Sequence, residues 1–389
     1  MARVKKIKIL FAGGGTGGHI FPLIAVGEHL MHRITDEGLV PDIRYFGSPG
    51  TFRGALEESN IRVTPIASSK WRNYVSILNI LDIFKFAIGL IQSFWKVYWF
   101  MPHAVFTKGG PGTVPIIYAC RFYTIPIIVH ESDAIPGRAV RIAAKRARRI
   151  ELSFPDAAPY FPNNIPSQVT GNPVRSDIVK RSGTTTKDGV RASKLEFGFN
   201  PDEPVVLVIG GSQGAAKLNE FVLENLSELL VQFQVLHQTG LEQFTGYNQE
   251  YSFMHKGMSD ETKRRYHVVP FFSHNIASAY EAADIVIARA GSGLIFEIAA
   301  MRKPAILIPL ENSAHDHQKI NAYAYAKLGG ASVVEEDNML GGILITAIQK
   351  ILSHEEIKQN MANAAEGFFR PDAAMKIGDD IVSVIANEK

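Results

Sequence analysis

One stretch, Gly13-Gly14-Gly15-Thr16-Gly17-Gly18-His19, constrains what this chain can fold into more than any other part of the sequence. Residues 8–12 before it are typical of a short buried strand. Residues 20–30 after it are typical of a helix, with Pro22 expected in the first turn, where its missing N–H costs nothing. Such a junction directs backbone N–H groups and the positive end of a helix at one spot. The stretch therefore predicts a site for a phosphate or pyrophosphate.

The glycines at 13, 15 and 18 also fit the G-x-G-x-x-G pattern of dinucleotide-binding loops. A dinucleotide site also has an acidic residue about 20 residues further on, at the end of the second strand. Here the second strand, expected over residues 43–46, runs into residues 47–50 (GSPG) without a carboxylate. The sequence therefore argues against a nicotinamide dinucleotide, and we expect no cofactor.

His19 places a titratable side chain where the anion is expected to bind. A neutral imidazole accepts protons near pH 7, so His19 is a candidate general base. The alternative is a histidine at a helix start that bonds a nearby carbonyl.

Apolar runs alternate with helical stretches along the whole chain, which is the pattern of doubly wound parallel sheets. A second strand–glycine loop–helix junction follows about 200 residues after the first, at residues 205–214. The sequence predicts two Rossmann-like α/β domains over residues 1–170 and 171–371, with a helix over 372–389 that could pack back on the first. Ligands of such sheets bind at the carboxyl ends of strands, so the site is expected in the cleft between the domains. Polar residues 181–194 are expected to form an early loop of the second domain. The strands are expected at 7–12, 43–46, 104–107, 125–130, 150–153, 168–170, 205–209, 234–237, 267–270, 285–288, 305–309 and 331–334.

Composition narrows the class of protein further. The formal net charge of +3 is too small to indicate a nucleic-acid partner. The single cysteine, Cys120, excludes a disulfide framework and fits a reducing compartment. No apolar run reaches the roughly 18 residues of a membrane span, and the first residues do not resemble a secretory signal.

Two amphipathic segments could contact a membrane surface. Around residues 71–101, a narrow polar stripe faces a broad surface rich in Phe, Ile, Trp and Tyr. Residues 138–150 carry Arg and Lys on one side, which suits anionic lipid headgroups. The alternatives are a helix packed between the sheet and neighbouring loops, and an ordinary solvated charged face.

In the first half, two further segments after strands could carry chemistry. The loop Lys108-Gly109-Gly110 could close on the same anion as residues 13–18, although a plain tight turn is the alternative. The segment at residues 130–137 holds Glu131 and Asp133, either of which could bind sugar hydroxyls or act as a base. An aspartate at a helix start can also be a simple cap.

In the second half, three segments suit a nucleotide sugar. Ser212 lies in a glycine loop that could cradle phosphate but lacks the Walker A pattern, which argues against ATP hydrolysis. The helix expected after residue 291 could hold a leaving diphosphate, and Glu297 could accept from ribose hydroxyls or simply interact with the helix dipole. Gln318 and Asn321 share a helix face and could both reach a sugar. No D-x-D pair is present, and we expect no metal.

These segments, in this order, resemble the MurG family of peptidoglycan N-acetylglucosaminyltransferases over nearly the whole chain. The matching motifs are GGGTGGHIFP (13–22), HESDAIPG (130–137), TGNPVR (170–175), GGSQGA (210–215), EIAA (297–300) and DHQKINA (316–322). Where the family usually has Asn at the fourth position of its H-E-x-N motif, this chain has Asp133. Pro111 stands where the family usually has Tyr, and AGSGL (290–294) stands where it usually has S-G-A-x-T.

The resemblance implies a two-domain GT-B glycosyltransferase, peripheral to the cytoplasmic face of the inner membrane. It implies inverting transfer of N-acetylglucosamine (GlcNAc) from UDP-GlcNAc to lipid I, the undecaprenyl-pyrophosphoryl-linked muramyl peptide, which gives lipid II. It also implies a role in cell-wall synthesis, cell shape and division, with cell-wall synthesis proteins as partners. A glycosyltransferase for another lipid, a nucleotide-sugar epimerase or hydrolase of the same fold, and a non-catalytic scaffold are the alternatives.

The resemblance also implies roles for individual residues. His19 is the first choice for the base and Glu131 the second. The acceptor pyrophosphate would bind at Gly13, Gly14, Gly15, Lys108, Gly109 and Gly110. Contacts to UDP-GlcNAc would come from Thr16, Gly17, Gly18, Asp133, Arg175, Ser212, Phe272, Ser292, Gly293, Leu294, Glu297, Gln318 and Asn321.

Overall fold

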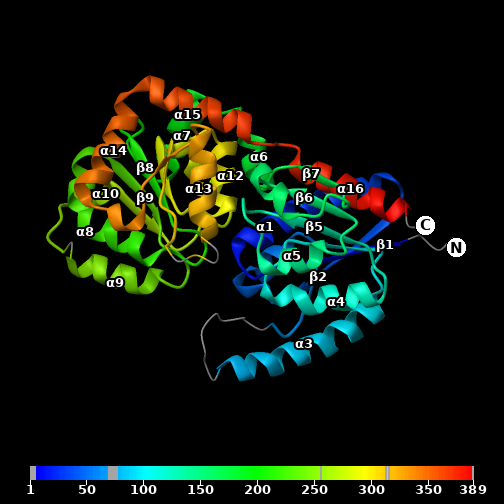
Figure 1. The fold of residues 1–389 in the computed structure, drawn as a ribbon. Coiled ribbons are helices and arrows are strands. Elements are labelled where there is room, and N and C mark those ends of the chain that lie inside the picture. The colour runs from blue at the N-terminus through cyan, green and yellow to red at the C-terminus, as the bar shows by residue number, and fades with distance from the viewer. Residues whose placement is uncertain (1–5, 69–77, 255, 312, 314–315, 388–389) are drawn as a thin grey trace. The chain divides into compact units, whose positions relative to one another are not determined.

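The structure is a computed structural model that describes residues 6–68, 78–254, 256–311, 313 and 316–387. The chain divides into two compact units, which are residues 1–175 with 370–389 (unit 1) and residues 176–369 (unit 2). Each unit is built on a parallel sheet flanked by helices (Figure 1). The expectation of two Rossmann-like α/β domains of the GT-B class is confirmed.

Unit 1 contains a seven-stranded sheet among its described residues. Its central strands β1, β4 and β5 are almost wholly buried, which explains why they appear in the sequence as continuous apolar runs. In spatial order the strands are β3 (Arg62–Pro65), β2 (Val40–Gly47), β1 (Lys6–Ala12), β4 (Ala104–Thr107), β5 (Ile127–Glu131), β6 (Arg149–Leu152) and β7 (Ser167–Val169).

The helices of unit 1 are α1 (Gly17–Asp36), α2 (Arg53–Glu58), α3 (Leu78–Phe100), α4 (Val114–Phe122), α5 (Arg138–Ala144) and α16 (Ala373–Asn387). Helix α16 comes from the far end of the chain and packs on α1. Asp379 pairs with His29 of α1 at 3.3 Å, and Asp380 pairs with Arg149 of β6 at 2.8 Å. The C-terminal helix therefore belongs to the core of unit 1.

Unit 2 contains a six-stranded parallel sheet among its described residues. Its strands, in spatial order, are β10 (Tyr266–Val269), β9 (Gln234–Gln238), β8 (Val205–Ile209), β11 (Ile285–Ala288), β12 (Ala305–Leu307) and β13 (Ser332–Val333). Its helices are α6 (Ser176–Arg181), α7 (Lys187–Glu196), α8 (Ala216–Gln232), α9 (Phe244–Met254), α10 (Asp260–Arg264), α11 (Ile276–Ala282), α12 (Ser292–Ala300), α13 (His317–Lys327), α14 (Gly341–Ser353) and α15 (Glu355–Phe368).

Both sheets reverse their strand order at one point. In unit 1 the reversal lies between β1 and β4, and in unit 2 between β8 and β11. Crevices at the carboxyl ends of such neighbouring strands are the ligand sites of doubly wound folds. The topology therefore brings the glycine loop after β1 beside the loop after β4, and the loop after β8 beside the start of α12.

Three local expectations were wrong. Helix α1 begins at Gly17, so Pro22 lies in its second turn rather than its first. Because Pro22 has no N–H, the carbonyl of Gly18 lacks its hydrogen bond within the helix. Gly18 is exposed, so this carbonyl can bond water instead. Residues 181–194 are largely helical, in α6 and α7, rather than a loop. The edge strand β3 was missed because it is short and partly exposed.

Helix α3 is amphipathic, as expected, but its polar stripe faces the protein. Gln92 Oε1 accepts from the backbone N–H of Ala67 at 2.9 Å, and the Lys96 ammonium donates to the carbonyl of Pro65. A Cβ on Gly89 would lie 2.3 Å from the Ala67 carbonyl oxygen, so only glycine allows this approach. Val97 and Phe100 are buried against unit 1, and most of the remaining aromatic and aliphatic side of the helix is exposed. Within the described residues, no helix is long and apolar enough to cross a membrane.

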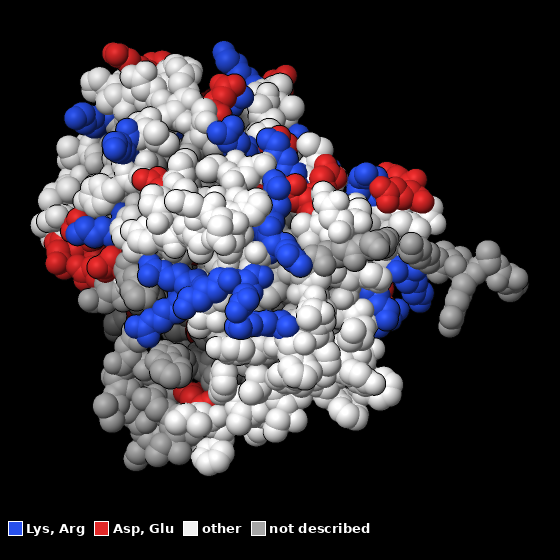
Figure 2. Space-filling view, turned by 45° about the vertical axis from the view of Figure 1, so that its right-hand side comes forward, with Lys and Arg blue, Asp and Glu red and all other residues white. Residues whose placement is uncertain are grey.

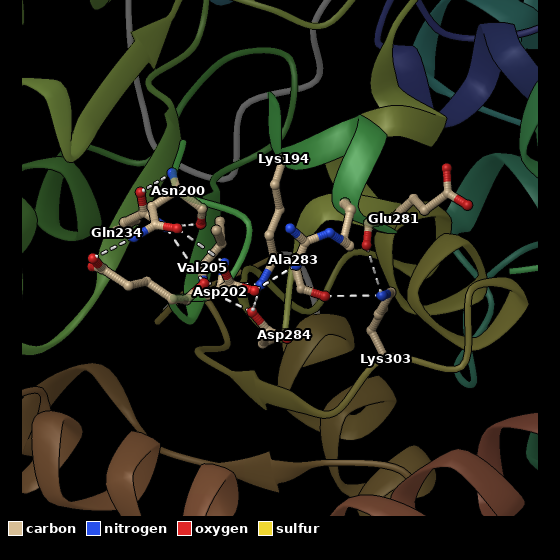
Figure 3. Close-up of polar contacts among 11 residues, drawn as sticks. Lys194, Asn200, Asp202, Val205, Gln234, Glu281, Ala283, Asp284 and Lys303 are labelled. Carbon is tan, nitrogen blue, oxygen red and sulfur yellow. Dashed lines mark hydrogen bonds and ion pairs between the residues drawn. The ribbon is translucent and has the colours of Figure 1, made fainter. Parts of the chain in front are cut away.

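A polar cluster at the amino-terminal edge of the unit 2 sheet holds helices to strands (Figure 3). The Asp284 carboxylate accepts from the buried Lys194 ammonium at 2.8 Å and from the Val205 N–H at 2.8 Å. The Lys303 ammonium donates to the carbonyls of Glu281 and Ala283 at 3.1 and 2.8 Å. Burial lowers the pKa of Lys303 to about 8. These bonds fix the end of α11 beside the start of β11.

We expect Asp284→Ala to lower the free energy of unfolding by about 3 kcal/mol, because the buried Lys194 ammonium loses its carboxylate partner and keeps only the Glu203 carbonyl, and the Val205 N–H loses its acceptor. Urea denaturation followed by circular dichroism measures the change. Asp202→Ala is the matched control, since the Asp202 carboxylate pairs with Arg191 at an exposed position and such pairs contribute little. Equal losses in the two variants would contradict the assignment.

Candidate active site

Two glycine loops of unit 1 touch each other. Gly110, in the loop after β4, has φ of 100°, and a Cβ there would lie 3.0 Å from the backbone nitrogen of Gly14. On the other side, a Cβ on Gly15 would lie 2.6 Å from the Ser48 carbonyl oxygen. The absence of side chains leaves a surface made of main chain next to the start of α1. Such a surface can bind an anion through N–H groups.

His19 lies in the first turn of α1, beside this surface. Its Nδ1 lies 2.9 Å from the hydroxyl of Thr16, and a Cβ on Gly14 would lie 2.9 Å from the same nitrogen. Thr16 occupies the N-cap position of α1, yet its hydroxyl makes no capping bond and contacts His19 instead. The local structure thus fixes the imidazole ring over Gly14.

Arg175 adds a cation to the same region of unit 1. Its guanidinium lies over the ring of Phe21, 4.7 Å from the ring centroid, and Phe21 is one turn after Gly17 on α1. The motif TGNPVR therefore ends beside the glycine stretch, although the two are far apart in sequence.

Glu131, the last residue of β5, holds a loop rather than facing solvent. Its buried carboxylate accepts from the N–H of Asp133 at 2.9 Å and of Gly137 at 3.2 Å. Gly137 is the N-cap residue of α5, so Glu131 connects β5 to the start of that helix. Burial and the negative charge of Asp133 raise the pKa of Glu131 to about 8, although the two backbone bonds and Lys108 act in the opposite direction. This placement fits a structural role better than that of a general base.

Lys108 does not lie as expected. The residue is 3% exposed, and its ammonium donates to His130 Nδ1 at 3.0 Å and to Asn172 Oδ1 at 2.9 Å. Its backbone N–H donates to the carbonyl of Ala12. An ammonium engaged in the interior does not contact an anion at Gly109 and Gly110 directly, so the expected contact between Lys108 and pyrophosphate needs correction.

In unit 2, the loop after β8 is shaped by close main-chain contacts. A Cβ on Gly214, whose φ is 85°, would lie 2.2 Å from the Thr239 carbonyl oxygen. The buried Gln238, which sequence reasoning missed, donates to the Gly211 carbonyl at 3.1 Å and accepts from the Phe272 N–H at 3.0 Å. It thereby connects the loop that carries Ser212 to the segment after β10.

Helix α12 begins with Ser292, Gly293 and Leu294, as expected for an anion site. The N–H groups of a first turn lack acceptors within the helix. Glu297, one turn on, is half-buried, and its Oε2 accepts from the hydroxyl of Tyr280 at 2.9 Å. Tyr280 lies on α11 and is fully buried. Sequence reasoning missed Tyr280 because a tyrosine in a buried helix has no distinctive pattern.

Two predicted donor contacts of unit 2, Phe272 and Asn321, lie differently from the expectation, and a third, Gln318, keeps part of its side chain accessible. The ring of Phe272 is 1% exposed and packs edge-on against Phe197, so it cannot stack on a base in this conformation. The side chain of Asn321 is buried and donates to the Ala290 carbonyl at 3.4 Å, which supports the loop before α12. Gln318 is partly exposed, and its Oε1 accepts from the Leu310 N–H at 3.0 Å.

A charged network follows β11. Arg289 pairs with Glu336, whose carboxylate also lies 3.3 Å from the Lys217 ammonium, and Lys217 lies 2.9 Å from Glu311. Arg289 and Glu336 are almost fully buried. The network joins the segments after β11, β12 and β13 to the start of α8. A charged residue directly after a buried strand was the signal that could have indicated Arg289. Among the described residues, no group of three or more His, Cys, Asp or Glu side chains could hold a metal ion.

Two Rossmann-like parallel-sheet domains with glycine loops at their strand ends define the GT-B fold class. The model of the glycosyltransferase family 28 N-terminal domain matches residues 9–151, and that of the C-terminal domain matches residues 205–377. The chain belongs to the MurG family within glycosyltransferase family 28.

The curated relatives reported below share the same enzyme name. The UDP-N-acetylglucosamine–N-acetylmuramyl-(pentapeptide) pyrophosphoryl-undecaprenol N-acetylglucosamine transferase of Treponema denticola is 34% identical over 397 residues, which covers 98% of each chain. Transferase 2 of that name from Bacillus cereus is 34% identical and covers 91% of this chain and 92% of its own.

Solved structures share the fold. The crystal structure of Acinetobacter baumannii MurG has a TM-score of 0.68 at 24% identity and covers 97% of this chain and 99% of its own. A UDP-GlcNAc 2-epimerase from Neisseria meningitidis has a TM-score of 0.64 at 13% identity and covers 98% of this chain and 100% of its own.

Proposed function

We propose that this chain transfers GlcNAc from UDP-GlcNAc to the muramyl sugar of lipid I, which gives lipid II with inversion at C1. The observation that carries the proposal is the contact between the loops at Gly14 and Gly110 beside His19. A pyrophosphate bound by main-chain N–H groups would place a lipid-linked sugar next to a general base. The names of the curated relatives support this donor and this acceptor.

The donor would bind to unit 2. The first turn of α12 and the glycine loop with Ser212 would bind the diphosphate. Glu297, oriented by Tyr280, would accept from the ribose hydroxyls. Gln318 would contact the sugar. These groups stabilise the charge that develops on UDP as the glycosidic bond breaks, and they need no metal to do so.

The reaction would be a single displacement, in which an acceptor hydroxyl attacks the anomeric carbon opposite UDP. His19 would take the hydroxyl proton. In the tautomer whose Nδ1–H donates to the Thr16 hydroxyl, Nε2 is the basic nitrogen. In this arrangement Thr16 would therefore orient the general base His19 rather than contact the sugar donor, UDP-GlcNAc.

The outer face of α3 would rest on the membrane that holds the acceptor. Its exposed side chains are Ile83, Phe84, Ile88, Ile91, Trp95, Tyr98 and Trp99. Part of this face, with Tyr123, lines an apolar groove of about 570 Å³. Burying such a face in water-free surroundings is favourable, whereas leaving it in water is costly.

Exposed cations of unit 1 would add attraction to anionic lipids. Arg138, Arg141 and Lys145 of α5 and its C-cap, with Arg146 and Arg148 after it, are exposed. Figure 2 shows a band of Lys and Arg side chains above a broad surface that carries little charge. Each cation near an anionic surface contributes about 1 kcal/mol. We propose a peripheral position on the cytoplasmic face of the inner membrane, where cell-wall synthesis proteins are possible partners.

Transfer of radiolabelled GlcNAc from UDP-GlcNAc to a short-chain lipid I analogue, with EDTA present, tests the proposal. Labelled product is expected. UDP-GlcNAc that binds but is not transferred would contradict this acceptor. Consumption of UDP-GlcNAc without any acceptor would instead indicate an epimerase or hydrolase.

We expect Tyr280→Phe to weaken the preference for UDP over 2′-deoxy-UDP about tenfold, because the Glu297 carboxylate loses a charge-assisted hydrogen bond that orients it. Competitive inhibition by the two nucleotides measures the preference. Tyr325→Phe is the matched control, since Tyr325 is also fully buried and its hydroxyl has no hydrogen-bond partner among the described residues. An unchanged preference in Tyr280→Phe would refute the orienting role.

A further inference from the structure

The last residue of β9, Gln238, is a buried polar side chain that the mechanism above does not use. Strand β9 lies between β8 and β10 in the sheet of unit 2, so its carboxyl end lies between the loop that carries Ser212 and the segment after β10. We propose that Gln238 is a positioning residue that fixes these two segments relative to each other and so restricts the donor site to a nucleotide with a pyrimidine-sized base. This inference rests on the proposed function.

The side-chain amide of Gln238 bonds to the main chain on both sides of β9. Its Nε2 donates to the Gly211 carbonyl at 3.1 Å, and its Oε1 accepts from the Phe272 N–H at 3.0 Å. A carbonyl oxygen only accepts and a backbone N–H only donates, so the two bonds determine which way the amide faces. The residue is 1% exposed. A buried amide without partners is costly, so neither segment can move away from Gln238 without a penalty.

Main-chain contacts hold the loop after β9 against the same two segments. The Gly240 N–H donates to the Pro270 carbonyl at 3.0 Å, and the Leu241 N–H donates to the Ser212 carbonyl at 3.4 Å. A Cβ on Gly240, whose φ is 95°, would lie 2.3 Å from the backbone nitrogen of Gly214. The three strand-end segments therefore form one packed layer of main chain, so a change in the bonds across β9 acts on both outer segments.

The two outer segments would meet different parts of the donor. The loop with Ser212 would bind the diphosphate, and Glu297 would bind the ribose. The segment after β10 leads into α11, and Tyr280 of that helix donates to Glu297 at 2.9 Å. Since the base is attached to the ribose and ligands of such sheets lie along the carboxyl ends of the strands, the base would face the segment after β10.

A fixed spacing between these segments would select the base by its size. A purine has a second ring, so it needs more room than a pyrimidine between the ribose and the segment that faces the base. A site excludes the larger ligand only when its wall does not yield, because this kind of specificity comes from a clash with the wrong ligand. Loss of both Gln238 bonds would let the segment after β10 shift, and the penalty for a purine would fall.

Gln234, at the other end of β9, is a matched control. It is 2% exposed, and its amide also bonds one backbone N–H and one carbonyl, those of Asn200, at 2.7 and 2.8 Å (Figure 3). These bonds lie at the amino-terminal edge of the sheet, opposite the ligand edge. Gln234→Met and Gln238→Met remove the same chemical group from the same strand and keep a similar side-chain length. A difference between the two variants therefore reflects position rather than the loss of buried hydrogen bonds.

Two measurements on the full chain test the proposal. Titration with UDP and with ADP gives the nucleotide preference, and urea denaturation gives the free energy of unfolding. We expect Gln238→Met to lower the preference for UDP over ADP about tenfold and Gln234→Met to leave it unchanged, although both variants lose stability to a similar extent. Gln238→Glu keeps an acceptor for the Phe272 N–H and loses the amide donor to Gly211, so it should lower the preference by a smaller factor.

The inference is overturned if folded Gln238→Met keeps the preference of the wild type, or if Gln234→Met loses it equally. Where Gln238→Met does not fold, Gln238→Glu decides in its place, and an unchanged preference there overturns the inference. It is also overturned if neither Gln238 variant folds, because Gln238 would then serve the fold alone.

Failure of the proposed function is distinguishable, because the titrations require neither acceptor nor transfer. A wild type that prefers UDP but transfers nothing to the lipid I analogue would contradict the proposed function alone. A wild type without a preference for UDP would contradict both the proposed donor and the role of Gln238.

Discussion

His19→Ala is expected to lower the single-turnover rate of GlcNAc transfer by about 10²–10⁴-fold, which is the range that a positioned general base contributes. The imidazole is held over Gly14 by the Thr16 hydroxyl at 2.9 Å, beside the surface where the pyrophosphate would bind. Alanine removes the group that accepts the proton without changing the glycine loops. Rapid-quench measurement with UDP-GlcNAc and a short-chain acceptor gives the rate directly.

His32→Ala is the matched control for this experiment. His32 lies on the same helix, is exposed and is remote from the glycine stretch. It should transfer at the rate of the wild type. Binding of UDP, measured by titration, should be nearly unchanged in both variants, since His19 acts on the acceptor hydroxyl. A near-normal rate in His19→Ala would contradict its role as base and would leave the donor site intact.

The architecture could be predicted because it depends on patterns that short segments carry. Buried parallel strands appear as apolar runs, and glycine loops mark the junctions where the strand order reverses. The misses have local causes. Helix α1 starts two residues before His19, since the Thr16 carbonyl already accepts from the N–H groups of His19 and Ile20, and a proline in the second turn is tolerated where Gly18 is exposed. The strand β3 has too few apolar residues to stand out.

The site could be predicted only as far as main chain and motif order determine it. The glycine surface, the start of α12 and the position of His19 follow from such features. The conformations of Phe272, Asn321 and Lys108 do not, because each side chain could face a ligand or the interior, and only the packing of neighbouring elements decides. The partners Tyr280 and Gln238 come from elements that are distant in sequence, so no local pattern indicates them.

Helix α3 shows a different limit of sequence reasoning. The polar stripe was recognised, but amphipathic helices usually direct their apolar side to the core. Here the stripe bonds to the backbone at Pro65 and Ala67, and Gly89 allows a contact that no larger residue permits. The helix is therefore held to unit 1 by these polar contacts together with the buried Val97 and Phe100, and it presents the rest of its apolar side outward. Exposing these apolar side chains to water costs free energy, and contact with a membrane would remove that cost.

Replacing Ile91, Trp95 and Trp99 together with Gln is expected to weaken binding to lipid vesicles about 100-fold. The three side chains are 70%, 64% and 67% exposed. Full burial of one such side chain contributes about 1.5–3 kcal/mol, so a loss of only about 1 kcal/mol at each position has this effect. Co-sedimentation with vesicles that contain anionic lipid measures the partition coefficient. Folding should be unaffected, because these side chains contribute little to the core.

The matched control replaces Leu195, Val231 and Phe253 of unit 2 with Gln, since these are equally exposed but lie on three different helices. If exposed apolar area alone caused binding, both triple variants would lose it equally, and a membrane role for α3 would be contradicted. Removing the cations Lys145 and Arg146 should weaken binding only to anionic vesicles and only at low salt, because screening reduces surface attraction. The α3 variant should also transfer GlcNAc to a soluble short-chain acceptor at the normal rate and fail only with acceptor embedded in vesicles, since its effect lies in reaching the lipid rather than in the chemical step.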